Sequence, residues 1–249
     1  MKIIRCMYKG VPRWGVLKDS LVRFLSAAPY KAIALTSRWA PYEQVRLLVP
    51  AEPTKVILVG LNYRDHAKEL GFTVPKEPII FLKPPTSCIA HRQAVKYPRG
   101  VTRLDYEAEL AVVIKKQGKN IRESKIRDYI LGYTCLNDVT ARDLQARDGQ
   151  WTRAKSFDTF CPVGPCVETR LAGDTGIRLY LNGALKQRSS TKNFIFSLPE
   201  LISFISGIMT LMPGDVISTG TPPGVGSMKR GDTVSVDIEN VGVLSNTII

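Results

Sequence analysis

The segment Tyr106-Glu-Ala-Glu-Leu-Ala-Val-Val-Ile114 carries the sharpest local signal in this chain, because its residues alternate as they do on a strand. Side chains two residues apart on a strand point to the same face, so Glu107 and Glu109 project together. Two like charges that close are unfavourable unless a cation lies between them. The neighbouring apolar residues indicate a buried strand, where an unpaired carboxylate is costly. The pair therefore predicts a divalent metal site, and the alternative is an exposed edge strand whose acidic face is solvated.

A third carboxylate, Asp138, follows the next expected strand, residues 129–136, at the point where a helix is expected to begin. The alternative role of Asp138 is to cap that helix at its N-terminus, where Asp is favoured. Together, Glu107, Glu109 and Asp138 offer only oxygen ligands, which suit Mg²⁺, Mn²⁺ or Ca²⁺ rather than zinc. The chain has 2 histidines, which excludes a His-rich metal site.

Other segments predict a chain rich in strands. Residues 55–59 and 78–82 are continuous apolar runs and are expected to be buried strands. Asn182-Gly183 is the signature of a two-residue hairpin turn, and residues 234–249 alternate like an edge hairpin. Ser197-Leu-Pro-Glu200 is a capping box, which predicts the start of an amphipathic helix. The predicted fold class is α+β, β-rich, with a few helices.

The chain is expected to divide near residue 50. Residues 1–50 read as a short, basic section of small strands and turns, and Pro50 and Pro53 indicate a linker because proline favours extended neighbours. We therefore expect a small N-terminal β subdomain over residues 1–50 and a catalytic domain over residues 51–249.

The net positive charge is the unusual feature of this chain's composition. Of the 249 residues, 35 are Lys or Arg and 22 are Asp or Glu, giving a formal net charge of +13. Such an excess suggests an anionic partner, either nucleic acid or a small acidic substrate. Nucleic-acid binding would require a Lys/Arg run or stripe with interleaved aromatic residues. The basic residues here are scattered, so we expect a small carboxylate substrate and no nucleic-acid partner.

Composition also limits the compartment and the chemistry. No apolar run is long enough to span a membrane, so we expect no membrane association, and the N-terminus lacks the pattern of a signal peptide. Five cysteines without a framework spacing predict reduced thiols in a cytoplasmic protein. No Gly-x-Ser-x-Gly motif is present, which excludes a serine hydrolase of the nucleophile-elbow type.

Several specific segments occur in order over roughly residues 55–249. They include Gly60-Leu-Asn-Tyr-Arg-Asp-His-Ala-Lys-Glu69, Phe81-Leu-Lys-Pro-Pro85, Asp105-Tyr-Glu-Ala-Glu-Leu110, Asn137-Asp-Val-Thr-Ala-Arg-Asp-Leu-Gln145 and Ala154-Lys-Ser-Phe157. In these segments the chain resembles the fumarylacetoacetate hydrolase superfamily, of the short bacterial type. The resemblance implies a mixed β-sandwich roll, a homodimer, and Mg²⁺ or Mn²⁺ held by Glu107, Glu109 and Asp138.

The resemblance also implies roles for residues around the metal. Lys155 and Gln145 match positions near the substrate oxygens, where they would stabilise a developing oxyanion. Without the resemblance, they read as a surface lysine and a solvated helix residue. Lys83, Arg142 and Thr221 are expected to bind the substrate. The glycine-rich loop that contains Thr221 lacks the Gly-Lys-Ser/Thr ending of a phosphate loop, and its alternative role is a tight turn.

His66 and Glu69 are a second candidate pair. Residues three apart on a helix lie on one face, so the carboxylate can orient the imidazole and raise its basicity. Such a pair can deprotonate a water molecule or a substrate carbon. The alternative is an ordinary amphipathic helix with a solvated charge pair. The resemblance implies a lid segment in which His66 acts as the base and Glu69 orients it.

The expected function is a divalent-metal enzyme acting on 2-oxo acids. The ion would stabilise the enolate that forms when a C–C or C–H bond breaks next to the carbonyl. We expect C–C cleavage first, as acylpyruvate hydrolysis or oxaloacetate decarboxylation, because the His66–Glu69 pair can activate water. Isomerisation or tautomerisation of a 2-hydroxy-dienedioate, such as 2-hydroxyhepta-2,4-diene-1,7-dioate, shares the same enolate and is the alternative.

Overall fold

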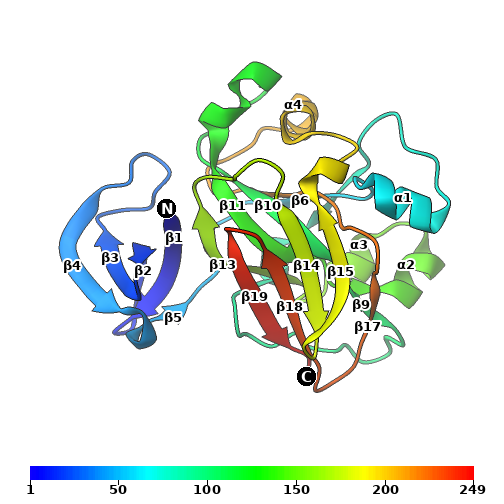
Figure 1. Ribbon diagram of the computed structural model, residues 1–249, viewed down its shortest axis with the longest axis horizontal. Helices are drawn as coiled ribbons and strands as arrows, with labels where there is room; N and C mark the ends of the chain where they lie inside the picture. Colours follow the sequence, from blue (N-terminus) through cyan, green and yellow to red (C-terminus); the bar gives the residue numbers. More distant parts are fainter.

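The computed structural model describes residues 1–249 (Figure 1). Its helices are α1 (Arg64–Leu70), α2 (Arg142–Asp148), α3 (Thr152–Lys155) and α4 (Leu198–Ile208). Its strands are β1 (Lys2–Tyr8), β2 (Val11–Lys18), β3 (Leu21–Leu25), β4 (Leu35–Pro41), β5 (Arg46–Leu47), β6 (Val56–Val59), β7 (Ile80–Lys83), β8 (Cys88–Ile89), β9 (Leu104–Tyr106), β10 (Ala108–Ile114), β11 (Ile130–Asn137), β12 (Thr140–Ala141), β13 (Cys161–Glu168), β14 (Gly176–Leu181), β15 (Ala184–Ser190), β16 (Val216–Ser218), β17 (Gly226–Met228), β18 (Thr233–Ile238) and β19 (Gly242–Thr247). The expected α+β, β-rich fold class is confirmed.

A 12-stranded mixed sheet forms the body of the molecule, with the path β4-β3-β2-β1-β13-β11-β10-β16-β6-β7. Strand β10 lies inside this sheet, paired antiparallel with β11 and β16, and all of its residues are buried. Most neighbours are antiparallel, whereas β16 and β6 run parallel. The apolar segment 106–114 therefore lies in the interior, as its composition predicts.

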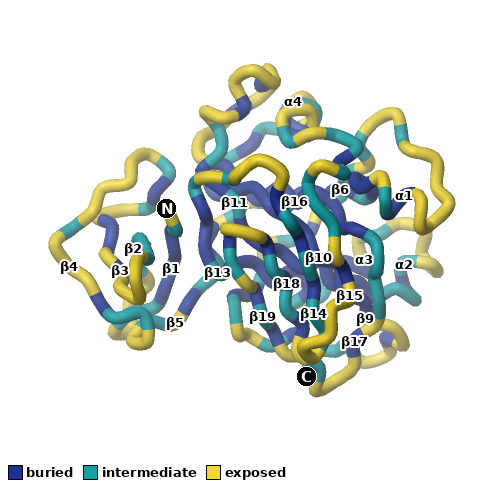
Figure 2. The backbone as a smooth tube through the Cα atoms, viewed as in Figure 1, coloured by how far each residue is buried: buried dark blue, intermediate teal, exposed yellow.

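A second sheet covers one face of the first, which makes the sandwich. It has four strands in the order β15-β14-β18-β19, and Figure 1 shows it lying in front of β10 and β11. Leu110 packs in the same core as Leu179 and Val236 of this sheet. Further along β10, Val112 packs with Ile202 and other residues of α4 instead. Figure 2 shows the buried chain concentrated in β10, β11, β13 and β16.

Residues 1–50 project to one side of the body, at the left of Figure 1. Their strands are joined to the large sheet because β1 pairs with β13, at Lys2 with Glu168 and Ile3 with Val167. The exposed loops of this part appear yellow in Figure 2. The two-part division at residue 50 stays a prediction, since the large sheet runs through both parts.

Several local predictions can be compared directly with the structure. The Ser197–Glu200 capping box is present at the start of α4, and Asn182 and Gly183 both adopt positive φ between β14 and β15. The alternative role of Asp138 as a helix cap is wrong: α2 begins at Arg142, with Ala141 as its cap residue, because β12 intervenes. None of the helices has the length and apolar character needed to cross a membrane.

Candidate metal and acid–base site

The local backbone brings Glu107 and Asp138 together. Glu107 lies between β9 and β10, where the chain leaves one sheet and enters another. Its backbone N–H donates to Asn137 Oδ1 at 3.0 Å, and its carbonyl accepts from the Asp138 N–H at 2.9 Å. The two carboxylates are therefore held side by side by the pairing of β10 with β11.

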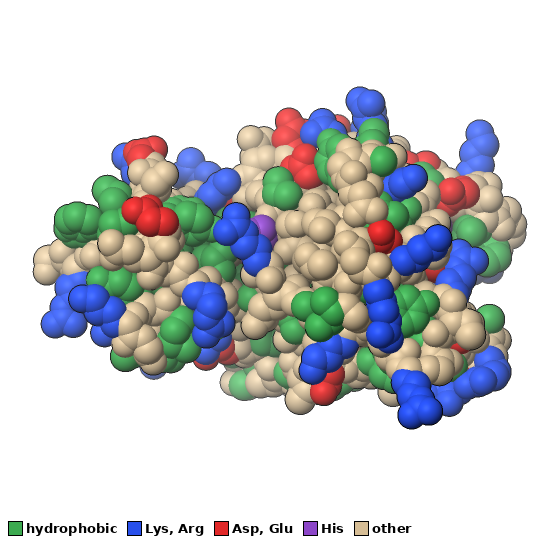
Figure 3. Space-filling view, turned by 90° about the horizontal axis from the view of Figure 1, so that it is seen from below, with side chains coloured by type: hydrophobic (Ala, Val, Ile, Leu, Met, Phe, Trp, Pro, Cys, Tyr) green, Lys and Arg blue, Asp and Glu red, His purple; other side chains and the backbone are tan.

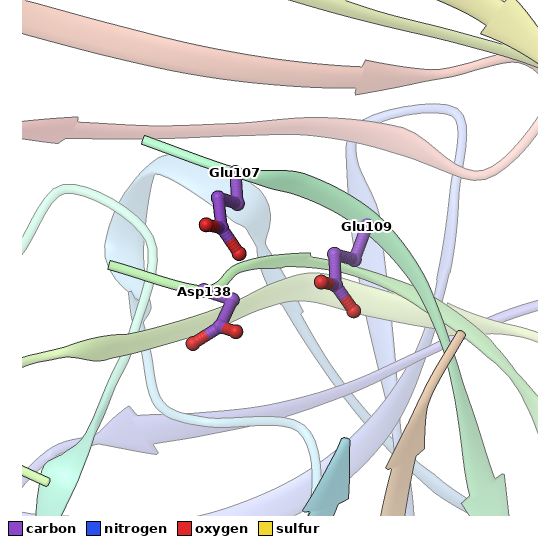
Figure 4. Close-up of side chains that lie close together, drawn as sticks. All are labelled: Glu107, Glu109 and Asp138. Carbon is purple, nitrogen blue, oxygen red and sulfur yellow. The ribbon is translucent and has the colours of Figure 1, made fainter. Parts of the chain in front are cut away.

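Glu107, Glu109 and Asp138 form one buried acidic triad (Figure 4). One ligand atom from each residue lies within 4.8 Å of the others. Glu109 Oε2 accepts from Ser218 Oγ and from the Gly220 N–H, whereas its Oε1 makes no hydrogen bond to the protein. Burial raises the pKa of Glu109 well above its usual value, and the nearby charge of Asp138 adds to this effect. Converging carboxylates with a free oxygen fit a hard divalent cation such as Mg²⁺ or Mn²⁺.

Lys155 lies at the edge of this triad and is itself buried. Its Nζ donates to Glu107 Oε2 at 2.9 Å and to Asp138 Oδ2 at 2.5 Å. Burial acts to lower the pKa of Lys155, but Asp138 and Glu107 outweigh it and the pKa is raised. Burial likewise acts to raise the pKa of Glu107, but Lys155 and Arg142 hold it at about 2. A permanent positive charge therefore stands beside the predicted ligands.

Lys83 lies behind Asp138 rather than on the cavity wall. Its side chain is fully buried, and its Nζ is 2.5 Å from Asp138 Oδ1 and 3.0 Å from the Val139 carbonyl oxygen, with a further bond to the Phe160 carbonyl. The expected contact of Lys83 with substrate stays a prediction. The contacts present favour a positioning role, in which Lys83 holds one oxygen of Asp138.

Lys83→Met is expected to lower the free energy of unfolding by about 3 kcal/mol, because it leaves Asp138 Oδ1 and two buried carbonyl oxygens without the Lys83 ammonium. Urea denaturation of the metal-free protein measures the change. The exposed Lys96→Met is the matched control and should leave the midpoint unchanged. A Lys83 variant as stable as the Lys96 variant would show that the buried pair contributes nothing to folding.

Arg142 is the centre of a charged network that reaches the triad. It donates from Nε to Asp105 Oδ2 at 2.8 Å, and its other nitrogens donate to Glu107 and to Gln145 Oε1. Gln145 therefore keeps its amide N–H groups for another partner. Asp105 is fully buried and also accepts from Arg103. In the sequence, Asp105 is part of a motif without a role of its own, and no sequence signal points to Arg103.

His66 and Glu69 face each other on α1, as their spacing predicts. His66 Nδ1 lies 2.8 Å from Glu69 Oε2, and Glu69 Oε1 accepts from the Gly224 N–H at 3.0 Å. His66 is mostly buried, whereas 42% of the Glu69 side chain is exposed. The Nε2 atom of His66 makes no hydrogen bond to the protein. The carboxylate therefore fixes the ring, and the second ring nitrogen is free to exchange a proton.

One cavity of about 610 Å³ joins these groups. Thr221 lines it too, and its hydroxyl accepts from Gln187 Nε2 at 3.0 Å. Of the predicted site residues, those on the cavity wall are His66, Glu69, Glu107, Asp138, Arg142, Gln145, Lys155 and Thr221. Glu109 and Lys83 lie deeper. The remainder of the wall includes apolar side chains such as Trp151 and Phe72, which sequence reasoning did not single out.

Known proteins match both parts of the chain. The family model described as fumarylacetoacetate (FAA) hydrolase C-terminal matches residues 55–249, and the model described as Rv2993c-like, N-terminal matches residues 1–50. Oxaloacetate tautomerase Fahd2a, mitochondrial, from Rattus norvegicus is 39% identical over 94% of this chain and 80% of its own length.

Solved structures of similar proteins extend the likeness to the whole chain. The 5-carboxymethyl-2-hydroxymuconate delta-isomerase from Mycobacterium smegmatis superposes with a TM-score of 0.95 at 39% identity, covering 100% of this chain and 99% of that one. The fumarylacetoacetate hydrolase (EaFAH) from Exiguobacterium antarcticum superposes with a TM-score of 0.90 at 32% identity, with the same coverage. The similar proteins thus include a tautomerase, an isomerase and a hydrolase.

Proposed function

Because this chain belongs to the fumarylacetoacetate hydrolase family, we propose that it is a divalent-metal enzyme that interconverts the keto and enol forms of a 2-oxo acid. The observation that carries this proposal is the free Nε2 of His66 in the same cavity as the acidic triad. Mg²⁺ or Mn²⁺ on Glu107, Glu109 and Asp138 would supply Lewis-acid stabilisation of an enolate. The tautomerase and the isomerase among the similar proteins support this reaction class.

In this proposal, His66 and Glu69 transfer the proton. Nε2 of His66 accepts the proton from the substrate carbon next to the carbonyl while the C–H electron pair becomes the enolate. Glu69 stays hydrogen-bonded to Nδ1 and stabilises the imidazolium that forms. The same proton then moves from Nε2 to the enolate oxygen, which gives the enol. The reverse sequence returns the keto form, so no other reactant is consumed.

Lys155 and Gln145 bind and orient the oxygens of the substrate in the proposed complex. The raised pKa of Lys155 keeps it protonated, so it can donate to an anionic oxygen. Gln145 has its amide N–H groups available because Arg142 occupies its oxygen. We further propose a small anionic substrate, a homodimer and a cytoplasmic location; the five free cysteines agree with that location.

C–C cleavage of an acylpyruvate or of oxaloacetate is the second candidate. The partly exposed Glu69 side chain lets water reach the His66–Glu69 pair. His66 could then take a proton from water instead of from a substrate carbon. The hydrolase among the similar proteins supports this candidate.

The two candidates differ in their products. The purified protein is given the enol form of oxaloacetate with Mg²⁺ or Mn²⁺, and loss of enol absorbance is followed together with release of pyruvate. Tautomerisation removes the enol without forming pyruvate, whereas decarboxylation forms pyruvate. Acetylpyruvate tests hydrolysis by the release of acetate. No reaction with either compound, with either metal, would contradict the proposed function.

Metal binding is expected to stabilise the fold, because it relieves the repulsion among buried carboxylates. Mn²⁺ at about 100 times its Kd should add about 2.7 kcal/mol to the free energy of unfolding. Thermal melts in chelator and in Mn²⁺ measure the gain. The variant Glu109→Gln should lose most of it, and an unchanged melting temperature with saturating Mn²⁺ and Mg²⁺ would contradict the metal site.

A further inference from the structure

One cation on the cavity wall makes a single side-chain hydrogen bond. The wall carries Lys155, Arg142 and Arg103. Lys155 is bound to two carboxylates, and Arg142 donates to three different side chains. Arg103 makes a single side-chain bond, from Nε to Asp105 Oδ1 at 2.9 Å, and its side chain is 55% exposed. Neither terminal nitrogen of Arg103 has a hydrogen-bond partner in the protein, so both remain available to a ligand.

Arg103 lines a second cavity as well as the first. This cavity, of about 870 Å³, is lined by Arg103 together with Arg99, Lys229 and Arg230, and no Asp or Glu lines it. Arg230 is held over the Tyr97 ring, with its carbon 5.6 Å from the ring centroid. We call this second cavity the basic groove. Figure 3 shows that basic side chains are otherwise dispersed over the face it draws, so a groove with four cations is a local concentration of charge.

Asp105 fixes the direction of the Arg103 side chain. Its two oxygens accept from Arg103 and from Arg142 separately, so one buried negative charge is shared by two guanidinium groups. Together, Asp105, Arg103 and Arg142 carry a net positive charge at the cavity wall. A guanidinium held by Nε presents its two outer N–H groups as a fork, which matches the two oxygens of a carboxylate.

We infer that Arg103 binds the distal carboxylate of a dianionic 2-oxo acid whose reacting end lies at the acidic triad and Lys155. The inference rests on the proposed function and adds the residue that recognises the outer end of the substrate. Arg103 does not contact the triad itself: its link to Glu107 passes through Asp105 and Arg142. It is therefore placed to bind the outer end of a substrate and not its reacting carbonyl.

The apolar side chains of the same cavity wall would suit a different class of substrate. Leu70, Phe72 and Trp151 line the cavity and carry no charge. A monoanionic acylpyruvate with an apolar tail would pack there and would not need Arg103. The relative rates with a dianion and a monoanion therefore distinguish the two classes of substrate.

The test compares Arg103→Gln with the wild type in Mn²⁺, using enolisation of oxaloacetate as the dianion and of acetylpyruvate as the monoanion. Loss of a charge-assisted bond should lower kcat/KM for oxaloacetate about 10- to 100-fold, mainly through KM. The value for acetylpyruvate should stay near that of the wild type. Arg99→Gln is the matched control, because it removes the same charge from the basic groove outside the metal cavity; it should preserve the wild-type ratio of the two values.

Equal losses with both substrates would overturn the inference, since they would mean that Arg103 only supports Asp105. Wild-type kcat/KM for oxaloacetate in Arg103→Gln would overturn it as well. Thermal melts and Mn²⁺ binding of the variant separate these results from misfolding.

Calorimetric binding of 2-oxoglutarate and 2-oxopentanoate gives an answer that does not depend on turnover. These compounds have the same chain length, and only the first has a distal carboxylate. Wild type should bind 2-oxoglutarate more tightly, and Arg103→Gln should remove the difference. Absence of turnover would contradict the proposed function, whereas equal binding of the two compounds by the wild type would contradict the Arg103 subsite.

Discussion

Glu107→Gln is expected to lower kcat/KM for oxaloacetate tautomerisation by about 10³-fold, because Lewis-acid stabilisation contributes several kcal/mol to such reactions. The substitution removes one charged ligand of the triad and also the acceptor shared by Lys155 and Arg142. Mn²⁺ affinity, measured by calorimetry, should fall with the rate. Chelator treatment of the wild type should reproduce the loss, and added Mn²⁺ should reverse it.

The matched control is Glu52→Gln, which removes a carboxylate from a surface ion pair with Arg5 and leaves the cavity intact. It should keep wild-type activity and wild-type Mn²⁺ affinity. Should Glu107→Gln retain full activity after chelator treatment, enolate formation in this protein would not depend on the triad.

Much of the fold follows from local patterns, and what does not follow depends on long-range pairing. Alternation predicts the strand around Glu109, and the capping box predicts α4. The interruption at Glu107 cannot be predicted from alternation, because it arises where β9 pairs with β12 and β17 while β10 pairs with β11 and β16. The attachment of β1 to β13 is likewise a contact between distant parts of the chain.

Some contacts in the candidate site likewise follow from sequence spacing, whereas others depend on distant parts of the chain. Glu107 and Glu109 are two residues apart, so strand geometry alone predicts that they meet. His66 and Glu69 are three residues apart on a helix, and their pairing follows equally well. Asp105 gains its role only because Arg142 approaches it from α2. No local pattern around Asp105 signals that approach.

Lys83 shows a further limit of sequence reasoning. Its match to a family motif predicts a place near the substrate, whereas its burial and its ion pair with Asp138 depend on how β7 packs against the segment after β11. A lysine motif can thus identify a functional region without telling which partner the ammonium contacts. Only the packed structure separates contact with substrate from support of a metal ligand.

His66→Asn is expected to lower kcat by about 10²- to 10⁴-fold, the range typical of losing a positioned general base. The variant keeps a polar side chain of similar reach but cannot carry the proton between carbon and oxygen. Mn²⁺ affinity should stay at the wild-type value, because His66 is not one of the three carboxylate ligands. The combination of low kcat with intact metal binding is what distinguishes a base from a ligand.

Glu69→Gln should cause a smaller loss than His66→Asn, because it leaves the imidazole in place and weakens only the group that orients it. The matched control is Glu77→Gln, because Glu77 is an exposed carboxylate in the segment that joins α1 to β7. This variant should behave as the wild type. If His66→Asn and Glu77→Gln had equal kcat, the proton would have to be carried by a group other than His66.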